Sequence, residues 1–331
     1  MLLGMEPQTL QDAICYFADP ANCRDYLIRR LWSDGKMRCP RCRSNNVKFS
    51  EKYNRWQCAS HHERRQFTLK TGTIFEDSPI GLDKWLTTLW MLVNCKNGVS
   101  SWEIHRTIGV TQKTAWFMLH RLRTILERED DGTKLGGTSG GEVEVDETFV
   151  GGKSRNMHRD KRARYAALGA IGGVTGKTAV QGILDRNQRK VRAEVVPDVK
   201  RETLQNAVLK NVKYGTAVYT DDAVAYDKLK WRYIHDVVNH ANEYVKGRVH
   251  TNGLENFWSL LKRNLRGTYV AVEPFHLDRY VDEQVFRYNN RGSRNEKITD
   301  ADRFSMAVSL LPGHRLTYSD LIGKAGIGQS L

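Results

Sequence analysis

Two closely spaced pairs of potential metal ligands near the N-terminus place the strongest constraint on how this chain folds. Cys39 and Cys42 are separated by two residues, and Cys58 and His61, which begin after fifteen intervening residues, repeat that spacing. Zinc prefers four tetrahedral ligands drawn from thiolate and imidazole, and two such pairs on a short hairpin supply them without a large core. The spacing therefore predicts one structural Zn²⁺ in a zinc ribbon over residues 37–72.

The fourth ligand of this ribbon is open at the level of the sequence, because His62 stands beside His61. The two-residue spacing favours His61. A redox-active pair is the alternative interpretation of Cys39 and Cys42, but a redox pair would not need Cys58 and a histidine beside it. Basic and aromatic residues surround these ligands, and they indicate either phosphate contacts or an ordinary solvated surface.

The helices that follow the ribbon are typical of a helix-turn-helix. Ser100 opens the first helix with a capping box, Gly109 ends it, and Thr111 caps the second helix. Gln112 and Lys113 stand at the N-terminal end of that second helix, where a recognition helix presents the residues that read DNA. We therefore predict that both contact DNA. The alternative is a plain helical bundle that joins two domains.

A linker rich in glycine and acidic residues, 129–141, separates this region from one with a different pattern. Residues 143–150 alternate apolar and polar side chains, as a half-buried strand does. The remaining expected elements are strands at 165–173, 177–185, 215–220 and 233–238, and helices at 200–212, at 223–230 and from about 252 onward. This order predicts an α/β domain with a largely covered, RNase H-like mixed sheet flanked by helices.

Three acidic residues fall on elements that converge at one end of such a sheet. Asp146 lies on the first strand, Asp221 follows the fourth strand, and Glu255 lies one turn into the last helix. Three other acids stand nearby and could be mistaken for members of the set: Glu144, Glu147 and Asp222. Asn252, Glu255, Ser259 and Lys262 share one face of the last helix.

Carboxylates brought together at neutral pH repel each other. At about 5 Å and an effective dielectric near 20, each pair costs roughly 3 kcal/mol. Divalent cations remove that cost, and Mg²⁺ keeps coordination positions open for phosphate oxygens. Two ions about 4 Å apart can activate an attacking oxygen and stabilise a leaving one. The sequence therefore predicts two Mg²⁺ (or Mn²⁺) ions held by Asp146, Asp221 and Glu255 as catalytic residues.

The overall charge agrees with a polyanionic partner. The chain of 331 residues carries a formal net charge of +14, which favours nucleic acid, although a merely basic protein is the alternative. Neither a secretory signal nor an apolar run of eighteen residues occurs, so we expect a cytoplasmic protein, associated with the nucleoid when on DNA, that does not engage a membrane.

Several motifs together resemble the bacterial and archaeal insertion-sequence transposases of the DDE type, in the zinc-ribbon group numbered fifteen-ninety-five. The resemblance covers about residues 10–310 and is carried by CPRCRS, WQCASHHERRQFTLKTGTIFEDSPIGLDKW, KTAWFMLHRLR, VEVDETFVGGK, VYTDDAVAY, HTNGLENFWSLLKR and RYVDEQVFRYNNR. It implies an RNase H-like fold with two-metal DNA cleavage and joining. It places the family's acids on Asp146, Asp221 and Glu255, and a basic residue that contacts transposon-end DNA on Lys262. The family's usual fourth ribbon ligand is Cys, whereas this chain has His61 or His62.

These observations predict a transposase that binds double-stranded DNA, namely the ends of its element and a target. A homodimer or larger assembly is expected, because two ends are cut and joined together. An RNase H-like nuclease or resolvase and a non-catalytic DNA-binding regulator are the alternatives. The expected domains are 1–36 (helices), 37–72 (zinc ribbon), 73–128 (helix-turn-helix region), 129–141 (linker), 142–310 (catalytic domain) and 311–331 (C-terminal tail).

Overall fold

The chain forms two compact units. The computed structural model describes residues 6–32, 34–128, 131–137, 140–152, 156–167, 174–221, 224–238, 250–292 and 297–323. One unit combines Met1–Glu127 with Asn290–Leu331, and the other is Arg128–Asn289. The chain passes from one unit to the other at Glu127–Arg128 and again at Asn289–Asn290. Residues from Asn290 onward pack with the N-terminal unit, whereas the sequence predicts a catalytic domain over 142–310.

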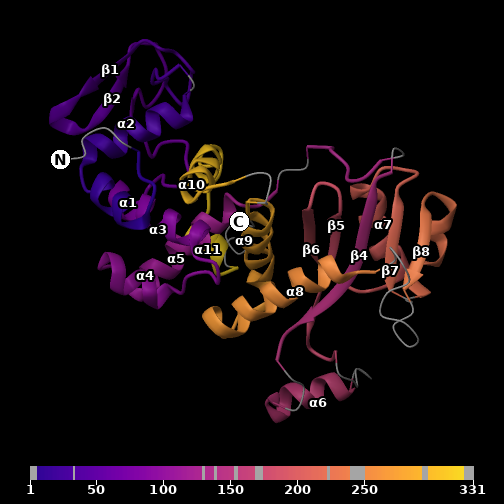
Figure 1. Ribbon diagram of the computed structural model, residues 1–331. Helices are drawn as coiled ribbons and strands as arrows, with labels where there is room; N and C mark the ends of the chain where they lie inside the picture. The colour runs from indigo at the N-terminus through magenta and orange to yellow at the C-terminus, as the bar shows by residue number, and fades with distance from the viewer. Residues whose placement is uncertain are drawn as a thin grey trace. The chain divides into compact units, whose positions relative to one another are not determined.

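Helices build most of the first unit (Figure 1). They are α1 (Leu10–Phe17), α2 (Pro20–Leu31), α3 (Leu82–Asn94), α4 (Ser101–Ile108), α5 (Gln112–Thr124), α10 (Asp300–Ser309) and α11 (Tyr318–Leu321). The ring of Phe304 on α10 is fully buried and contacts the rings of Phe17, Tyr26 and Trp90. This aromatic contact is the physical reason that the C-terminal segment belongs to the N-terminal unit.

The ribbon within this unit is a small antiparallel sheet of β1 (Val47–Ser50), β2 (Arg55–Cys58) and β3 (Gln66–Phe67), in that order. The 3₁₀ helix Glu51–Tyr53 connects the first two strands. The Trp56 ring on β2 contacts the ring of Phe49 and stacks on that of Phe67. A few aromatic contacts therefore replace the core that so short a sheet cannot build alone.

The second unit contains a five-stranded mixed sheet, β6-β5-β4-β7-β8. The strands are β4 (Glu142–Val150), β5 (Thr178–Asp185), β6 (Lys190–Val196), β7 (Ala217–Asp221) and β8 (Ile234–Val238). β5 pairs antiparallel with both β4 and β6. β7 pairs in parallel with β4, and β8 pairs in parallel with β7. This arrangement confirms the predicted RNase H-like mixed sheet flanked by helices.

Helices cover both faces of this sheet (Figure 1). On one face, α7 (Arg201–Asn211) packs over Val143 and Val145 of β4. On the other, α8 (Asn252–Asn264) and α9 (Leu277–Asn289) pack over β5 and β6. Glu144 and Asp146 alternate with the two valines, so they face α8. The alternation in the sequence therefore assigned the two faces of β4 correctly.

Two expected elements of this unit are wrong. A strand was expected over 165–173, but the helix α6 (Arg159–Ala167) takes its first part, and 168–173 lie outside the described residues. The third strand is instead β6, which the sequence interpretation missed. The expected helix over 223–230 is a 3₁₀ helix, Val224–Trp231. No helix in the described part of the chain is long and apolar enough to cross a membrane.

Candidate active site and metal centre

Asp146 and Asp221 lie at the same level on neighbouring parallel strands. Glu144 of β4 pairs with Tyr219 of β7, and each aspartate stands two residues further along its strand. Parallel strands lie about 4.8 Å apart, so this register places the two residues close together on adjacent strands. The two strands that carry these acids are therefore neighbours in the sheet.

Two hydrogen bonds orient the Asp146 carboxylate. The backbone N–H of Glu147 donates to Oδ1 at 2.9 Å, and the indole Nε1 of Trp258 donates to Oδ2 at 2.9 Å. Each oxygen keeps a further lone pair, so the carboxylate is held in place and can still bind a cation. Trp258 lies on α8 and is buried. The sequence interpretation assigned it no role.

Glu255 is an exposed residue in the first turn of α8. Burial raises the pKa of Asp146 to about 6, and the negative charges of Asp221 and Glu255 add to this effect. Asp221 and Glu255 therefore both act electrostatically on Asp146. Among the described residues, the carboxylate oxygens of these three acids do not form a group as compact as the cluster of Cys39, Cys42, Cys58 and His62 in the ribbon.

The three nearby acids have different surroundings. Glu144 is buried and ion-paired with Arg186, at 2.8 Å between Oε1 and Nε. Burial raises the pKa of Glu147 to about 8, with further contributions from Asp146 and Asp221, and its Oε1 is buried without a hydrogen-bond partner. Asp222 lies outside the described residues. The carboxyl group of Glu147 therefore interacts electrostatically with Asp146 and Asp221.

Lys262 lies two turns beyond Glu255 on α8 and is half-buried. Burial lowers the pKa of its ammonium group, Arg266 and Lys177 lower it further, and the Asp146 carboxylate opposes them. The lysine thus stands beside the acidic group, in company with two more cations. This combination of acids and adjacent bases suits a phosphodiester, whose oxygens need both metal ions and positive side chains.

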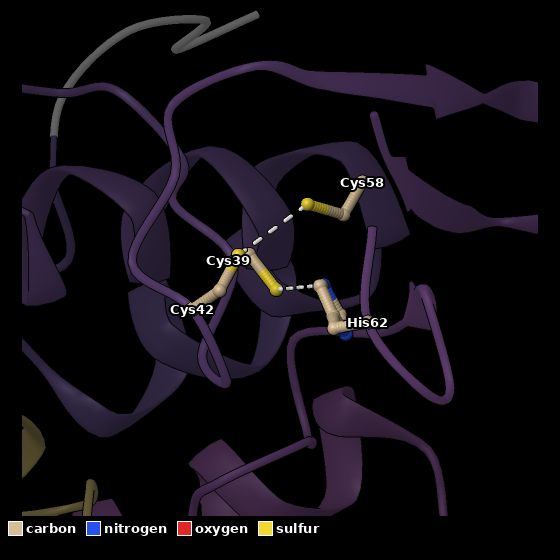
Figure 2. Close-up of side chains that lie close together, drawn as sticks. All are labelled: Cys39, Cys42, Cys58 and His62. Atoms are coloured by element: carbon tan, nitrogen blue, oxygen red, sulfur yellow. Dashed lines mark hydrogen bonds between the residues drawn. The ribbon is translucent and has the colours of Figure 1, made fainter. Parts of the chain in front are cut away.

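Three thiols and one imidazole meet in the ribbon (Figure 2). The ligand atoms of Cys39, Cys42, Cys58 and His62 all lie within 4.8 Å of one another. Cys39 Sγ is 3.5 Å from His62 Nε2, and Cys42 Sγ is 3.6 Å from Cys58 Sγ. A tetrahedral site with Zn–S bonds near 2.3 Å requires sulfurs about 3.8 Å apart. The donor set and its size therefore fit one zinc ion.

The expected fourth ligand, His61, is wrong. His61 is exposed, whereas His62 turns toward the thiols. The contact of His62 Nδ1 with the carbonyl of Glu63, at 2.6 Å, fixes the ring so that Nε2 points at Cys39. A hydrogen bond from the second ring nitrogen commonly orients a metal-binding histidine in this way.

The two helices expected around Ser100 and Thr111 are α4 and α5. Ser100 and Glu103 form the capping box of α4, and Gly109 ends that helix in the left-handed conformation with φ 63°. The amide of Gln112 donates to Ser101 Oγ at 2.8 Å, which ties it to α4. Lys113 is exposed, with Nζ 4.9 Å from the centre of the Tyr318 ring. Lys113 is therefore more exposed to solvent than Gln112.

The five-stranded mixed sheet flanked by helices fits the fold of the DDE transposases. Residues 138–289 match the family model of the ISXO2-like transposase domain. The resemblance in the sequence motifs is thereby confirmed.

Two known proteins show how far the similarity reaches. A protein described as uncharacterized, in transposable element ISH50 of Halobacterium salinarum, is 26% identical over 256 residues, covering 75% of this chain and 83% of the relative. A chain in the structure of the simian T-cell lymphotropic virus intasome in complex with PP2A regulatory subunit B56 gamma aligns with a TM-score of 0.29 at 12% identity. That alignment covers 65% of this chain and 74% of the viral complex chain, and a likeness so weak carries no functional inference.

Proposed function

We propose that this protein is a DDE transposase that binds the ends of its insertion sequence, cleaves them and joins them to target DNA. The observation that carries the proposal is the register of β4 and β7, which sets Asp146 and Asp221 side by side where the charge of Glu255 also acts. The transposase domain family and the relative from an insertion element support the same conclusion.

The acidic group fits divalent cations. Burial and the nearby charges of Asp221 and Glu255 raise the pKa of Asp146 to about 6, and a bound cation would offset that repulsion. Two bound Mg²⁺ or Mn²⁺ ions, held by Asp146, Asp221 and Glu255, would activate the attacking oxygen and stabilise the leaving one. In the ribbon, Cys39, Cys42, Cys58 and His62 would hold one structural Zn²⁺.

Side-chain and backbone groups of this protein orient the acids and supply positive charge for the reaction. Trp258 and the backbone of Glu147 hold the Asp146 carboxylate in one orientation, so no reorganisation is needed when DNA arrives. Lys262 supplies a positive charge to a phosphate beside the acids. The N-terminal end of α5 presents Lys113 to double-stranded DNA. We expect a homodimer or a larger assembly on DNA, because two element ends react together.

The test is Mg²⁺-dependent nicking and strand transfer on a labelled element end. Asp146→Asn, Asp221→Asn and Glu255→Gln keep side-chain size and remove charge, and each should reduce both steps at least about 100-fold. Glu202→Gln, an exposed acid on α7, is the matched control and should react as the wild type does. Activity retained in all three variants would end the DDE proposal. Nicking without any joined product would favour a nuclease instead.

A further inference from the structure

Glu144 connects β4 to the first turn of α8. Its Oε2 accepts a hydrogen bond from the backbone N–H of Leu254 at 2.9 Å, and its Oε1 accepts one from Arg186 Nε at 2.8 Å. Leu254 is the third residue of α8, whose N-cap residue, Thr251, provides no side-chain cap. The buried carboxylate therefore takes over the capping of this helix from another element, and its charge also suits the positive end of the helix dipole.

The sequence of α8 permits this close approach. A Cβ atom at Gly253 would lie 2.8 Å from Glu144 Oε2, so a glycine is needed where the helix meets the carboxylate. Arg186, the other hydrogen-bond partner of Glu144, is also held in position. It pairs with Glu142 at 3.4 Å and lies 4.3 Å over the Tyr219 ring. Both oxygens of Glu144 are thus engaged within the protein, which argues against Glu144 as a metal ligand.

A second contact fixes the same helix one turn later. Trp258 donates its indole hydrogen to Asp146 at 2.9 Å, two residues beyond Glu144 on β4. Glu255 lies between the two attachment points, directly after Leu254 and three residues before Trp258. The position of the third acid relative to the first is therefore set by two hydrogen bonds that both end on β4.

We propose that Glu144 is a positioning residue, which places Glu255 at the acidic site by holding the N-terminus of α8 on β4. The inference rests on the proposed function in one respect only, namely that Glu255 is an acid that binds metal there. The contact between Glu144 and α8 itself does not depend on the reaction. Glu144 lies outside the predicted triad and does not touch the reacting atoms. It acts by positioning Glu255.

The experiment perturbs the contact from each side. Glu144→Gln removes the charge that faces Arg186, and Gly253→Ala pushes the helix away while keeping every charge and raising helix propensity. Glu142→Gln is the matched control, because Glu142 lies on the same face of β4 and pairs with the same arginine. Val145→Ala, a buried valine on the opposite face, controls for a general loss of stability.

Two measurements read the result in the full-length protein. Hydrogen exchange reports the protection of the backbone amides in the first turn of α8, and titration with Mn²⁺ alone, followed by electron paramagnetic resonance, reports ion affinity. We expect Glu144→Gln and Gly253→Ala to lose protection at least about 10-fold in that turn. Their Mn²⁺ affinity should fall about 10-fold or more, as for other residues that orient metal ligands. Glu142→Gln and Val145→Ala should keep both properties near wild type.

The outcomes separate this inference from the proposed function. Full protection and unchanged Mn²⁺ affinity in both variants would overturn the positioning role. An affinity loss in Val145→Ala as large as in Glu144→Gln would reduce that role to general stability. If the wild type bound no Mn²⁺, the proposed function would fall, and the exchange data would still decide whether Glu144 holds α8.

Discussion

Gly182 lies directly across the β4–β5 ladder from Asp146, and it leaves the space that the Trp258 ring occupies. A Cβ atom at position 182 would lie 2.6 Å from the indole carbon Cζ2. The absence of a side chain on β5 is therefore what lets an indole from α8 reach the carboxylate on β4. β4, β5 and α8 are in contact at this point because position 182 has no side chain.

Gly182→Ala should displace the Trp258 ring and release the Asp146 carboxylate. We expect strand cleavage to fall about 10- to 100-fold, the usual effect of losing a group that orients a metal ligand, together with a lower Tm. Gly267→Ala is the matched control, because a Cβ there would meet open space. Cleavage at the wild-type rate in Gly182→Ala would show that the indole hydrogen bond is dispensable.

Glu147→Gln should stabilise the metal-free protein at pH 8 and have little effect at pH 4.5. The pKa of Glu147 is raised to about 8, so the folded state binds its proton more tightly than the unfolded state. The free energy of unfolding therefore falls as pH rises between the unfolded pKa near 4.5 and about 8. The variant does not lose this stability as pH rises, because glutamine does not ionise.

Thermal unfolding in a chelating buffer measures the effect of Glu147→Gln. Each kcal/mol of stability corresponds to about 2–4 °C in Tm for a unit of this size. Glu202→Gln, an exposed acid, should show no pH-dependent gain. An equal change in Tm at both pH values would contradict the assigned burial of the Glu147 charge.

His62→Ala should release the ribbon's zinc, whereas His61→Ala should retain it. Only the imidazole of His62 reaches the thiols, and zinc requires four ligands in a closed structural site. Metal analysis of purified protein should give about one zinc per chain in the wild type and in His61→Ala. Cys42→Ser should behave like His62→Ala. Less than about half an equivalent of zinc in the wild type would refute the site.

Lys262→Ala should weaken binding of element-end DNA without changing the affinity for divalent ions. The loss of one phosphate contact should reduce the slope of log affinity against log salt by about 1. Lys210→Ala, an exposed lysine on α7, provides the control. If Lys262→Ala lost ion affinity instead, its charge would act on the acids rather than on DNA.

Lys113→Ala should reduce binding to the element end more than binding to unrelated DNA. Lys113 is exposed at the start of α5, where direct contacts with base edges occur in helix-turn-helix proteins. Fluorescence anisotropy with both DNAs measures the ratio, with Lys96→Ala as the control. For about six neutralised phosphates, the salt slope of the wild type should be roughly −5. Equal losses on both DNAs would favour a structural helical bundle.

Sequence patterns correctly predicted those features that depend only on residues close together in the chain. The alternation of residues 143–150 assigned the faces of β4, because a strand's side chains alternate by geometry. The capping box at Ser100 predicted the start of α4 for the same reason, since both partners lie within one turn. Neither conclusion required knowledge of the rest of the fold.

Contacts between distant segments decided the remaining features. The choice of His62 over His61 depends on the path of the loop after β2, and the placement of α10 depends on Phe304 packing against residues nearly 300 positions earlier. The sequence alone identified the acids and thiols that we propose as metal ligands, because residue type sets ligand preference. Only the tertiary structure decided that Glu144 caps α8 and that Gly182 admits Trp258, because hydrogen bonding and close packing depend on distances between segments that the sequence does not encode locally.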